Sequence, residues 1–258
     1  MMPTMPATDA PSSRDQEAEP DPLLVLSFEP AHAILDRFVF GDLRGEAVDG
    51  LQAYFHHHIY ATRRFERLDG GGDRAEVANV LTGTDLAALP LLSIRLTRDD
   101  MVLDVLETHA VQISALLATI PADVAMAAAP WSLYAEGSPA YELYWLLWSC
   151  RGVGRTTAYK LLARKRPHLL PVYDERLRRL LGRPRNSWAC LWSWFQVQPE
   201  RAAGLANLRD EAGDIDDISL LRVLDVALWM YTDRYGTAVR PTDRLAADPH
   251  QAAGRVRR

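Results

Sequence analysis

The spacing of apolar residues predicts that most of this chain is helical. Apolar positions recur every three or four residues, which places them on one face of an α-helix. Together with capping residues, this spacing predicts helices at about 31–40, 46–65, 84–92, 99–120, 138–149, 155–166, 175–181, 200–212 and 219–231. The clearest amphipathic pattern, in 99–120, predicts an inner face made of Val102, Leu103, Leu106, Ile113, Leu116, Leu117 and Ile120.

Two short segments lack a helical period. Residues 23–28 could form a strand or lead into a helix, and residues 93–97 could form a short strand or an extended link. No internal repeat or long linker interrupts the chain. We therefore expect a single all-α domain over 23–236, with possible minor short strands. A disordered arm over 1–22 precedes it and a flexible tail over 237–258 follows, because both are polar and aperiodic.

Charge is unevenly distributed along the chain. Residues 151–185 hold eleven basic and two acidic residues, a formal charge of +9, whereas the whole chain carries −5. The residues outside this segment therefore sum to −14. A basic concentration on an acidic protein is not needed for solubility, so it indicates a partner that carries negative charge.

The local pattern of this segment predicts a tight bend between two helices. Ser138 and Pro139 form a helix start, and Gly152 and Gly154 allow the chain to turn about 15 residues later. The helix that follows begins with free backbone amides, which favour an anion such as a phosphate. Asp174 then stands directly before the next predicted helix.

The segment at about 138–181 resembles the helix-hairpin-helix (Gly/Pro/Asp) class of DNA glycosylases. The matching elements are Gly152-Val153-Gly154, Thr157-Ala158, Pro171-Val172 and Asp174, which lies twenty residues after the second glycine. The resemblance covers roughly forty of the 258 residues. This segment and the stretch ATRRFERLDGGGDR are also similar to a bacterial family of unknown function, which implies no activity.

The chain departs from the glycosylase pattern in several places. Members that also cut the DNA backbone carry a Schiff-base lysine two residues after the second glycine, where this chain has Thr156. Lyase activity is therefore not implied. Many members hold an iron–sulfur cluster on four cysteines, but this chain has only Cys150 and Cys190, so we expect no cluster and no other cofactor. Arg151 replaces the usual proline before the bend, and Tyr173 is inserted before the aspartate.

The leading interpretation is a DNA-binding protein that contacts phosphates without reading base sequence. The residues expected at this interface are Arg151, Gly152, Val153, Gly154, Arg155, Thr156, Lys160 and Arg164. Two alternatives remain open. The basic residues could pair with the acidic remainder of the chain or form a solvated face. The protein could also be a non-catalytic helical module whose basic face binds an acidic protein partner.

The resemblance implies that Asp174 supports base excision, as a step in DNA repair. In this role a carboxylate stabilises the positive charge that develops on the sugar and assists the attacking water, while the base occupies a cleft. An Asp that precedes a helix can instead cap its first amides, and both roles can hold at once. The tryptophans at 188, 192 and 194 could likewise stack on a base or belong to the core.

A histidine run and a glycine-rich loop are two further motifs in the sequence. His56, His57 and His58 are consecutive, so on a helix they point about 100° apart and cannot close on one metal ion. The Gly70–Gly72 loop lacks the following Lys-Ser/Thr of a nucleotide-binding loop; it connects elements or contacts a substrate. The absence of a leader and of long apolar runs, with only two cysteines, predicts a cytoplasmic protein without a membrane partner.

Overall fold

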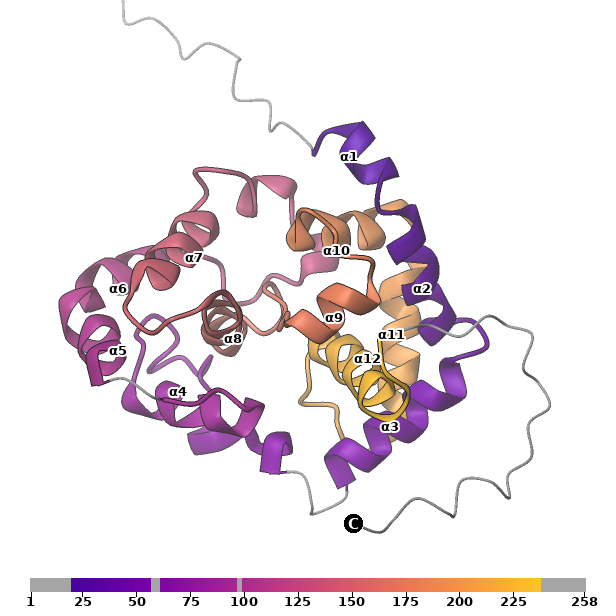
Figure 1. Cartoon of the computed structure of the whole chain (residues 1–258), viewed down its shortest axis with the longest axis horizontal. Coiled ribbons are helices and arrows are strands. Elements are labelled where there is room, and N and C mark those ends of the chain that lie inside the picture. The colour runs from indigo at the N-terminus through magenta and orange to yellow at the C-terminus, as the bar shows by residue number, and fades with distance from the viewer. Residues whose placement is uncertain (1–19, 57–60, 97–98, 238–258) are drawn as a thin grey trace, which may run out of the picture.

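The computed structural model describes residues 20–56, 61–96 and 99–237, and within these ranges it contains helices and no strand (Figure 1). The all-α prediction is therefore confirmed. The helices are α1 Pro22–Leu26, α2 Glu29–Val39, α3 Arg44–His56, α4 Gly83–Ala88, α5 Asp99–Leu103, α6 Ala110–Thr119, α7 Pro139–Ser149, α8 Arg155–Lys165, α9 Glu175–Leu180, α10 Ser187–Val197, α11 Glu200–Ala212 and α12 Leu220–Tyr235. Short 3-10 turns lie at Ala61–Arg64, Leu68–Gly70, Leu89–Leu92, Met126–Ala128 and Trp131–Leu133.

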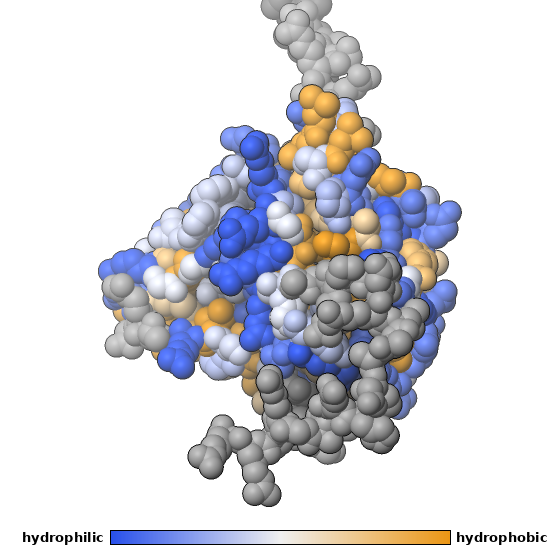
Figure 2. Space-filling model, turned by 45° about the vertical axis from the view of Figure 1, so that its right-hand side comes forward, coloured by the Kyte–Doolittle hydropathy of each residue, from blue (hydrophilic) through white to orange (hydrophobic). Residues whose placement is uncertain are grey.

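The segments whose type the sequence left open are not strands. Residues 22–26 form α1, capped by Asp21, so this run does lead into a helix. Residues 94–96 are irregular, and Thr97 lies outside the described residues. The expected arm and tail also fall outside them, apart from residues 20–22 and 237. Leu23 and Leu26 of α1 are largely exposed. Figure 2 shows hydrophobic surface at the top of the molecule, where α1 lies.

The helices form two groups that share one core. In Figure 1, α4 to α8 lie on the left and α1 to α3 with α9 to α12 lie on the right. On the right, α12 packs along α3 and also contacts α9 and α11; on the left, α7 packs against α6 and α8. One cluster of buried hydrophobic residues takes members from both groups, including Leu143, Leu162 and Leu224. The two groups are therefore parts of one domain.

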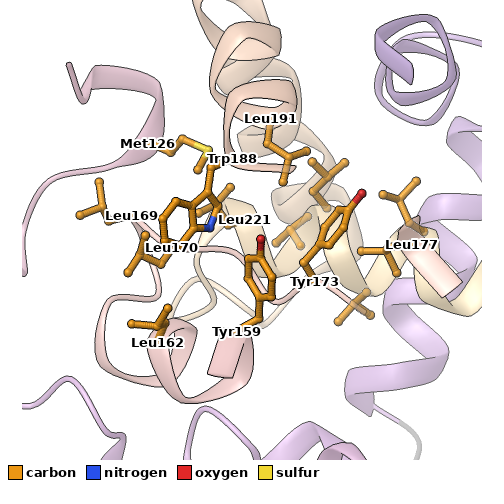
Figure 3. Packing of buried hydrophobic residues seen from close by; sticks show 14 of the residues in the cluster. Met126, Tyr159, Leu162, Leu169, Leu170, Tyr173, Leu177, Trp188, Leu191 and Leu221 are labelled. Atoms are coloured by element: carbon orange, nitrogen blue, oxygen red, sulfur yellow. The ribbon is translucent and has the colours of Figure 1, made fainter. Parts of the chain in front are cut away.

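Aromatic residues fill the centre of this core. Trp188 of α10 lies 5.9 Å from Tyr159 of α8, and Tyr159 lies 5.7 Å from Tyr173, measured between ring centroids (Figure 3). Trp188, Trp192 and Trp194 are all buried. The tryptophan-rich segment is thus core, and its rings are not available to stack on a base.

The expected helix over 99–120 is broken, which changes its inner face. A π-helical turn, Asp104–Thr108, separates α5 from α6 and shifts the positions that face inward. Val102 and Leu103 are consequently exposed, contrary to the prediction, whereas Met101 and Val105 are buried. The bent pair 100–108 and 110–119, which meet at 61°, has the length and composition of a broken membrane span, but no single described helix does.

The start of α4 also differs from the prediction. The sequence suggests Thr84-Asp85 as the cap, but Thr82 is the N-cap, and its hydroxyl accepts from the Asp85 amide at 3.3 Å. Asp85 is the third helical residue, and its carboxylate returns to the Thr82 amide at 2.8 Å. This reciprocal capping box positions the Asp85 carboxylate inside the protein.

The histidine run is only partly described. The expected helix over 46–65 ends at His56, whose Nε2 lies 3.1 Å from the carbonyl oxygen of Ala212 and 3.0 Å from that of Gly213. His56 therefore ties α3 to the end of α11. His57 and His58 lie outside the described residues.

The glycine-rich loop is shaped by close packing against α8. A Cβ at Gly72 would lie 2.6 Å from Cγ of Arg164 and 2.8 Å from Oδ1 of Asp85. We expect Gly72→Ala to destabilise the protein by about 1–3 kcal/mol, because Arg164 and Asp85 cannot both move aside. Urea denaturation would measure the loss. Gly83→Ala is the control: a Cβ there meets nothing within 4 Å, so unfolding stability should rise by about 0.4–1 kcal/mol. Equal effects of the two changes would contradict this explanation.

Candidate functional site

The bend between α7 and α8 is exposed at its two glycines. Ser138 caps α7 by accepting from the Tyr141 amide at 3.2 Å, and α7 ends at Ser149. Gly152 has a φ of 81°, which glycine adopts without strain, and Val153 is buried. Gly154 is the N-cap of α8 and provides no side-chain cap. The first backbone amides of α8 therefore lie next to the exposed backbone of Gly154 and have no side-chain cap.

Arg151 at the start of the bend is held by two carboxylates. Its backbone amide and its guanidinium both donate to Asp104, at 2.9 Å and 3.0 Å, and Asp100 lies 3.7 Å away. Hydrogen bonds from Arg151 lower the pKa of Asp104 to about 2. The Arg151 side chain is still 62% exposed, so the pair lies at the surface.

Two residues expected at a nucleic-acid interface lie inside the protein. The amine of Lys160 donates to the carbonyl oxygen of Leu92 at 2.6 Å. The guanidinium of Arg164 pairs with Asp85 at 2.9 Å, with both side chains 1% exposed. The prediction that Lys160 and Arg164 contact phosphate at the surface is therefore wrong, because each of them binds an oxygen atom inside the protein.

The two basic residues after Arg164 are buried as well. Lys165 pairs with the second oxygen of Asp85 at 2.5 Å and donates to the carbonyl oxygen of Gly72 at 3.0 Å. Arg166 donates to the carbonyl oxygen of Ile120 and to that of Ala78, both at 2.8 Å. These side chains join the end of α8 to the loop before α4 and to the end of α6. The charges of Lys165 and Arg166 therefore form contacts inside the fold.

The basic residues after Asp174 are largely paired at the surface. Arg176 lies 2.8 Å from Asp233, and Arg179 lies 2.9 Å from Glu175, which is also approached by Arg178 and Arg183. The +9 segment is thus divided among buried bonds and surface ion pairs. Within the described part of this segment, four basic residues form no ion pair with a carboxylate. Lys160 and Arg166 bond to carbonyl or amide oxygens inside the protein, and the other two are Arg155 and Arg185.

A cavity of about 360 Å³ lies between α8, α9 and α12. Its lining combines charged, hydroxyl and aromatic side chains, namely Tyr54, Thr62, Leu92, Ser93, Ile94, Thr156, Lys160, Val172, Asp174, Glu175, Arg176, Arg222, Asp225, Val226 and Trp229. Three residues singled out in the sequence therefore meet in one cavity: Thr156 and Lys160 from one face of α8, and Asp174 from the cap of α9.

Asp174 caps α9 with one oxygen only. Its Oδ1 accepts from the amides of Arg176 and Leu177, at 2.9 Å and 3.0 Å. No hydrogen bond within the described residues reaches Oδ2. The capping role inferred from the sequence is confirmed, and it leaves the second oxygen available to a ligand.

Arg222 is the centre of a buried polar network in the cavity wall. Its guanidinium donates to Glu66 and to Asp225, and it donates to the hydroxyl of Tyr54 at 2.6 Å. The side chains of Arg222 and Asp225 are 6% and 4% exposed. With Lys160 and Asp174, this network brings three carboxylates and two cations together.

Burial changes the proton affinity of groups in this network. It raises the pKa of Asp225 to about 7, although Arg222 opposes the shift, and the charge of Asp174 raises it further. It lowers the pKa of Lys160, against the attraction of Asp174 and Asp225. It also raises the pKa of Tyr54 to about 12. Such displaced values are typical of functional sites, where a proton must move near neutral pH.

A second cavity, of about 390 Å³, adjoins the first. Arg222 and Val172 line both, and the second also includes Gly70 and Gly71 of the glycine-rich loop. Glu66 faces this cavity, and its Oε2 is buried with no hydrogen-bond partner among the residues that the structure describes. The loop therefore contributes to a cavity wall as well as to the contacts of α8.

Neither cysteine is placed for metal binding. Cys150 and Cys190 are buried, and burial raises the pKa of the two thiols to about 11 and about 12. Over the ranges 20–56, 61–96 and 99–237, no group of three His, Cys, Asp or Glu side chains could hold a metal ion.

Several cavity residues were not found from the sequence. Tyr54 and Trp229 lie in predicted helices, where an aromatic residue by itself does not distinguish a cavity wall from the core. Arg222 and Asp225 did carry a signal, because they interrupt the apolar stripe of α12 three residues apart. Two charged residues on the buried face of a helix require partners, and these partners mark the cavity wall.

Comparison with known proteins identifies a family. The family described as "Family of unknown function (DUF6308)" matches residues 47–232, well over half of the chain, so the chain belongs to it. No curated protein and no solved structure matches the chain. The matched region contains α7, α8, Asp174 and the whole lining of the 360 Å³ cavity.

Proposed function

We propose that this member of the DUF6308 family binds DNA at the α7–α8 bend and hydrolyses the N-glycosidic bond of a nucleotide placed in the Asp174 cavity. One observation carries the proposal: Thr156, in the first turn of α8, and Asp174 line the same cavity. A phosphate held at the start of α8 and a sugar near Asp174 would then belong to the same nucleotide strand. The resemblance to helix-hairpin-helix DNA glycosylases supports the same assignment.

The start of α8 has the features of a phosphate contact. The helix has eleven residues and no side-chain cap, so its dipole and first amides favour an anion there. Gly152 and Gly154 are exposed, which lets a phosphate approach the backbone closely. Arg155 adds a charge at the same end. These contacts position DNA without reading its sequence, so we expect no strong sequence preference.

The cavity is suited to a planar, polar ligand. Trp229 provides an aromatic wall, with the guanidinium of Arg176 5.1 Å from its ring centroid. Thr156, Ser93 and Lys160 provide polar atoms at other points of the lining. A nucleobase rotated out of a duplex has this combination of flat faces and polar edges.

Asp174 is the proposed catalytic residue. Its Oδ2 would stabilise the positive charge that develops on the sugar as the base departs, and would then take a proton from the attacking water. Oδ1 is fixed by two amides of α9, which orients the carboxylate. Because the residue two positions after Gly154 is Thr156 and not an amine, the proposed reaction releases a base without cutting the backbone.

Binding of an acidic protein through a basic face has less support. Four of the eleven basic residues of 151–185 are buried, namely Lys160, Arg164, Lys165 and Arg166. Most of the others are paired with carboxylates. The basic residues of 151–185, which motivated this alternative, therefore do not form one continuous basic surface.

The function is tested by incubating the protein with duplex oligonucleotides that each carry one deaminated, oxidised or alkylated base. Released base is measured by chromatography, and strand cleavage is measured with and without later alkali. We expect release of at least one lesion and breaks only after alkali. If no base is released from any substrate of the set with protein in excess over DNA, the proposed base-excision activity is contradicted.

Reversing the charge at the bend tests the phosphate contact. We expect Arg155→Glu to weaken duplex binding by a similar factor for every sequence and to lower the slope of log K against log salt by about 1. Fluorescence anisotropy across a salt series would measure both. Arg234→Glu, at the far end of α12, is the control with the same charge change. A drop that is equal for both variants would indicate a general charge effect and not a local contact.

A further inference from the structure

Asp174, Glu175 and Asp225 are the carboxylates that line the cavity, and Asp225 differs from Asp174 in its environment. Both residues line the cavity, but Asp174 is part-exposed at the cap of α9, whereas Asp225 lies within the buried face of α12 with its side chain 4% exposed. Two carboxylates in such unlike surroundings favour opposite protonation states, since burial penalises the charged form.

The charges around Asp225 leave one negative charge in excess. It faces Arg222 on its own helix, Lys160 of α8, Asp174 at α9, the hydroxyl of Tyr54 from α3, and Glu66 through their shared guanidinium. Three carboxylates thus share two cations. Arg222 is divided between Glu66 and Asp225 and neutralises neither alone. Asp225 is the most buried of the three carboxylates, and an uncompensated negative charge is most costly there. A proton that removes the excess negative charge is therefore favoured on Asp225.

We propose that Asp225 is the general acid of this cavity and protonates the departing base while Asp174 acts on the sugar. This inference rests on the proposed function. The O–H of Asp225 transfers its proton to a ring nitrogen or exocyclic atom of the base, and the electron pair of the C1′–N bond goes to the base. Water then adds to C1′, and its proton passes to Asp174. Exchange with solvent returns the proton to Asp225 and removes that of Asp174.

The assignment restricts the substrate. A neutral base, such as a deaminated or oxidised one, departs as an anion unless it gains a proton, whereas an N7-alkylated purine already carries a positive charge and departs as a neutral molecule. Asp225 therefore matters for neutral bases only. A general acid typically contributes about 10²–10⁴-fold to a rate. The acid form is present below a pH of about 7 and is lost as pH rises through that value, because the raised pKa belongs to a carboxyl group.

Single-turnover base release distinguishes the role. Duplexes carry either a neutral lesion (uracil, hypoxanthine or 8-oxoguanine) or N7-methylguanine. We expect Asp225→Asn to slow release of the neutral lesion by about 10²-fold or more, and release of N7-methylguanine by less than about threefold. The parent should lose neutral-lesion activity about tenfold per pH unit above 7, and Asp225→Asn should lose that dependence. Asp225→Glu, which restores a carboxyl proton, should recover part of the neutral-lesion rate.

The outcomes separate this inference from the proposed function. Equal slowing of both substrates by Asp225→Asn would mean that Asp225 only maintains the cavity, and would overturn the inference while base excision stands. Release of N7-methylguanine alone by the parent would overturn it too. If the parent protein releases neither lesion, the result contradicts base excision and therefore also the role of Asp225 as general acid.

The proton can also be observed without a reaction. The carboxyl carbon of Asp225 in ¹³C-labelled protein, assigned by its loss in Asp225→Asn, should titrate near pH 7. Titration below pH 5 would show an ionised carboxylate at neutral pH and would overturn the inference. Thermal unfolding of each variant shows whether it is folded at the assay temperature.

Discussion

Asp174→Asn is expected to reduce base release by about 10²–10⁴-fold while leaving duplex affinity nearly unchanged. The amide has no negative charge to stabilise the sugar and cannot take a proton from water. Its side-chain oxygen can still accept from the amides of Arg176 and Leu177, because Asn and Asp are comparable N-caps. Stability should therefore change by less than about 0.5 kcal/mol. Single-turnover release, anisotropy and urea denaturation measure the three quantities.

Two further variants make this result specific. Asp233→Asn removes a more exposed carboxylate that pairs with Arg176 and does not line the cavity, and it should retain parental base release. Asp174→Ala should lose both activity and the cap, with a fall in unfolding stability of about 0.5–2 kcal/mol. Parental activity in Asp174→Asn would assign Asp174 to capping alone.

Asp85→Ala is expected to cause the largest loss of stability, about 3–5 kcal/mol. Asp85 binds Arg164 and Lys165 at once, and all three side chains are 1% exposed. Removing it leaves two buried cations without their carboxylate, and it removes the hydrogen bonds to the cap of α4. Because a typical domain is stable by only about 5–15 kcal/mol, the variant should unfold at much lower urea.

The matched control is a surface pair of the same chemistry. Glu211 lies 2.6 Å from Arg44, with the carboxylate side chain 52% exposed. Glu211→Ala should cost about 0–1 kcal/mol, since solvent screens the pair and solvates the remaining arginine. Similar losses for Asp85→Ala and Glu211→Ala would show that the internal pair contributes no more than an ordinary surface pair.

The functional residues divide into those that local sequence identifies and those that it does not. Asp174 follows an extended run and precedes a helix, so its cap position is visible in the sequence. Thr156 and Lys160 are four residues apart on a predicted helix, so a shared face could be expected. Nothing in the sequence indicates that this face meets Asp225 and Trp229, which belong to a helix more than 60 residues later.

Local sequence was sufficient to predict that this protein is helical, where most of its helices begin, and that Gly152 and Gly154 turn the chain. These features follow from the period of apolar residues and from caps, which depend on near neighbours. The direction of the charged side chains depends instead on contacts between segments that are distant in the chain. From the sequence, Arg164 is expected to contact a phosphate, and pairing with acidic residues or a solvated face is the alternative for Arg164 and Lys165. The fold brings Asp85 from 79 positions earlier to bind both cations, so pairing is the outcome. A buried ion pair depends on such distant partners, which no local pattern records.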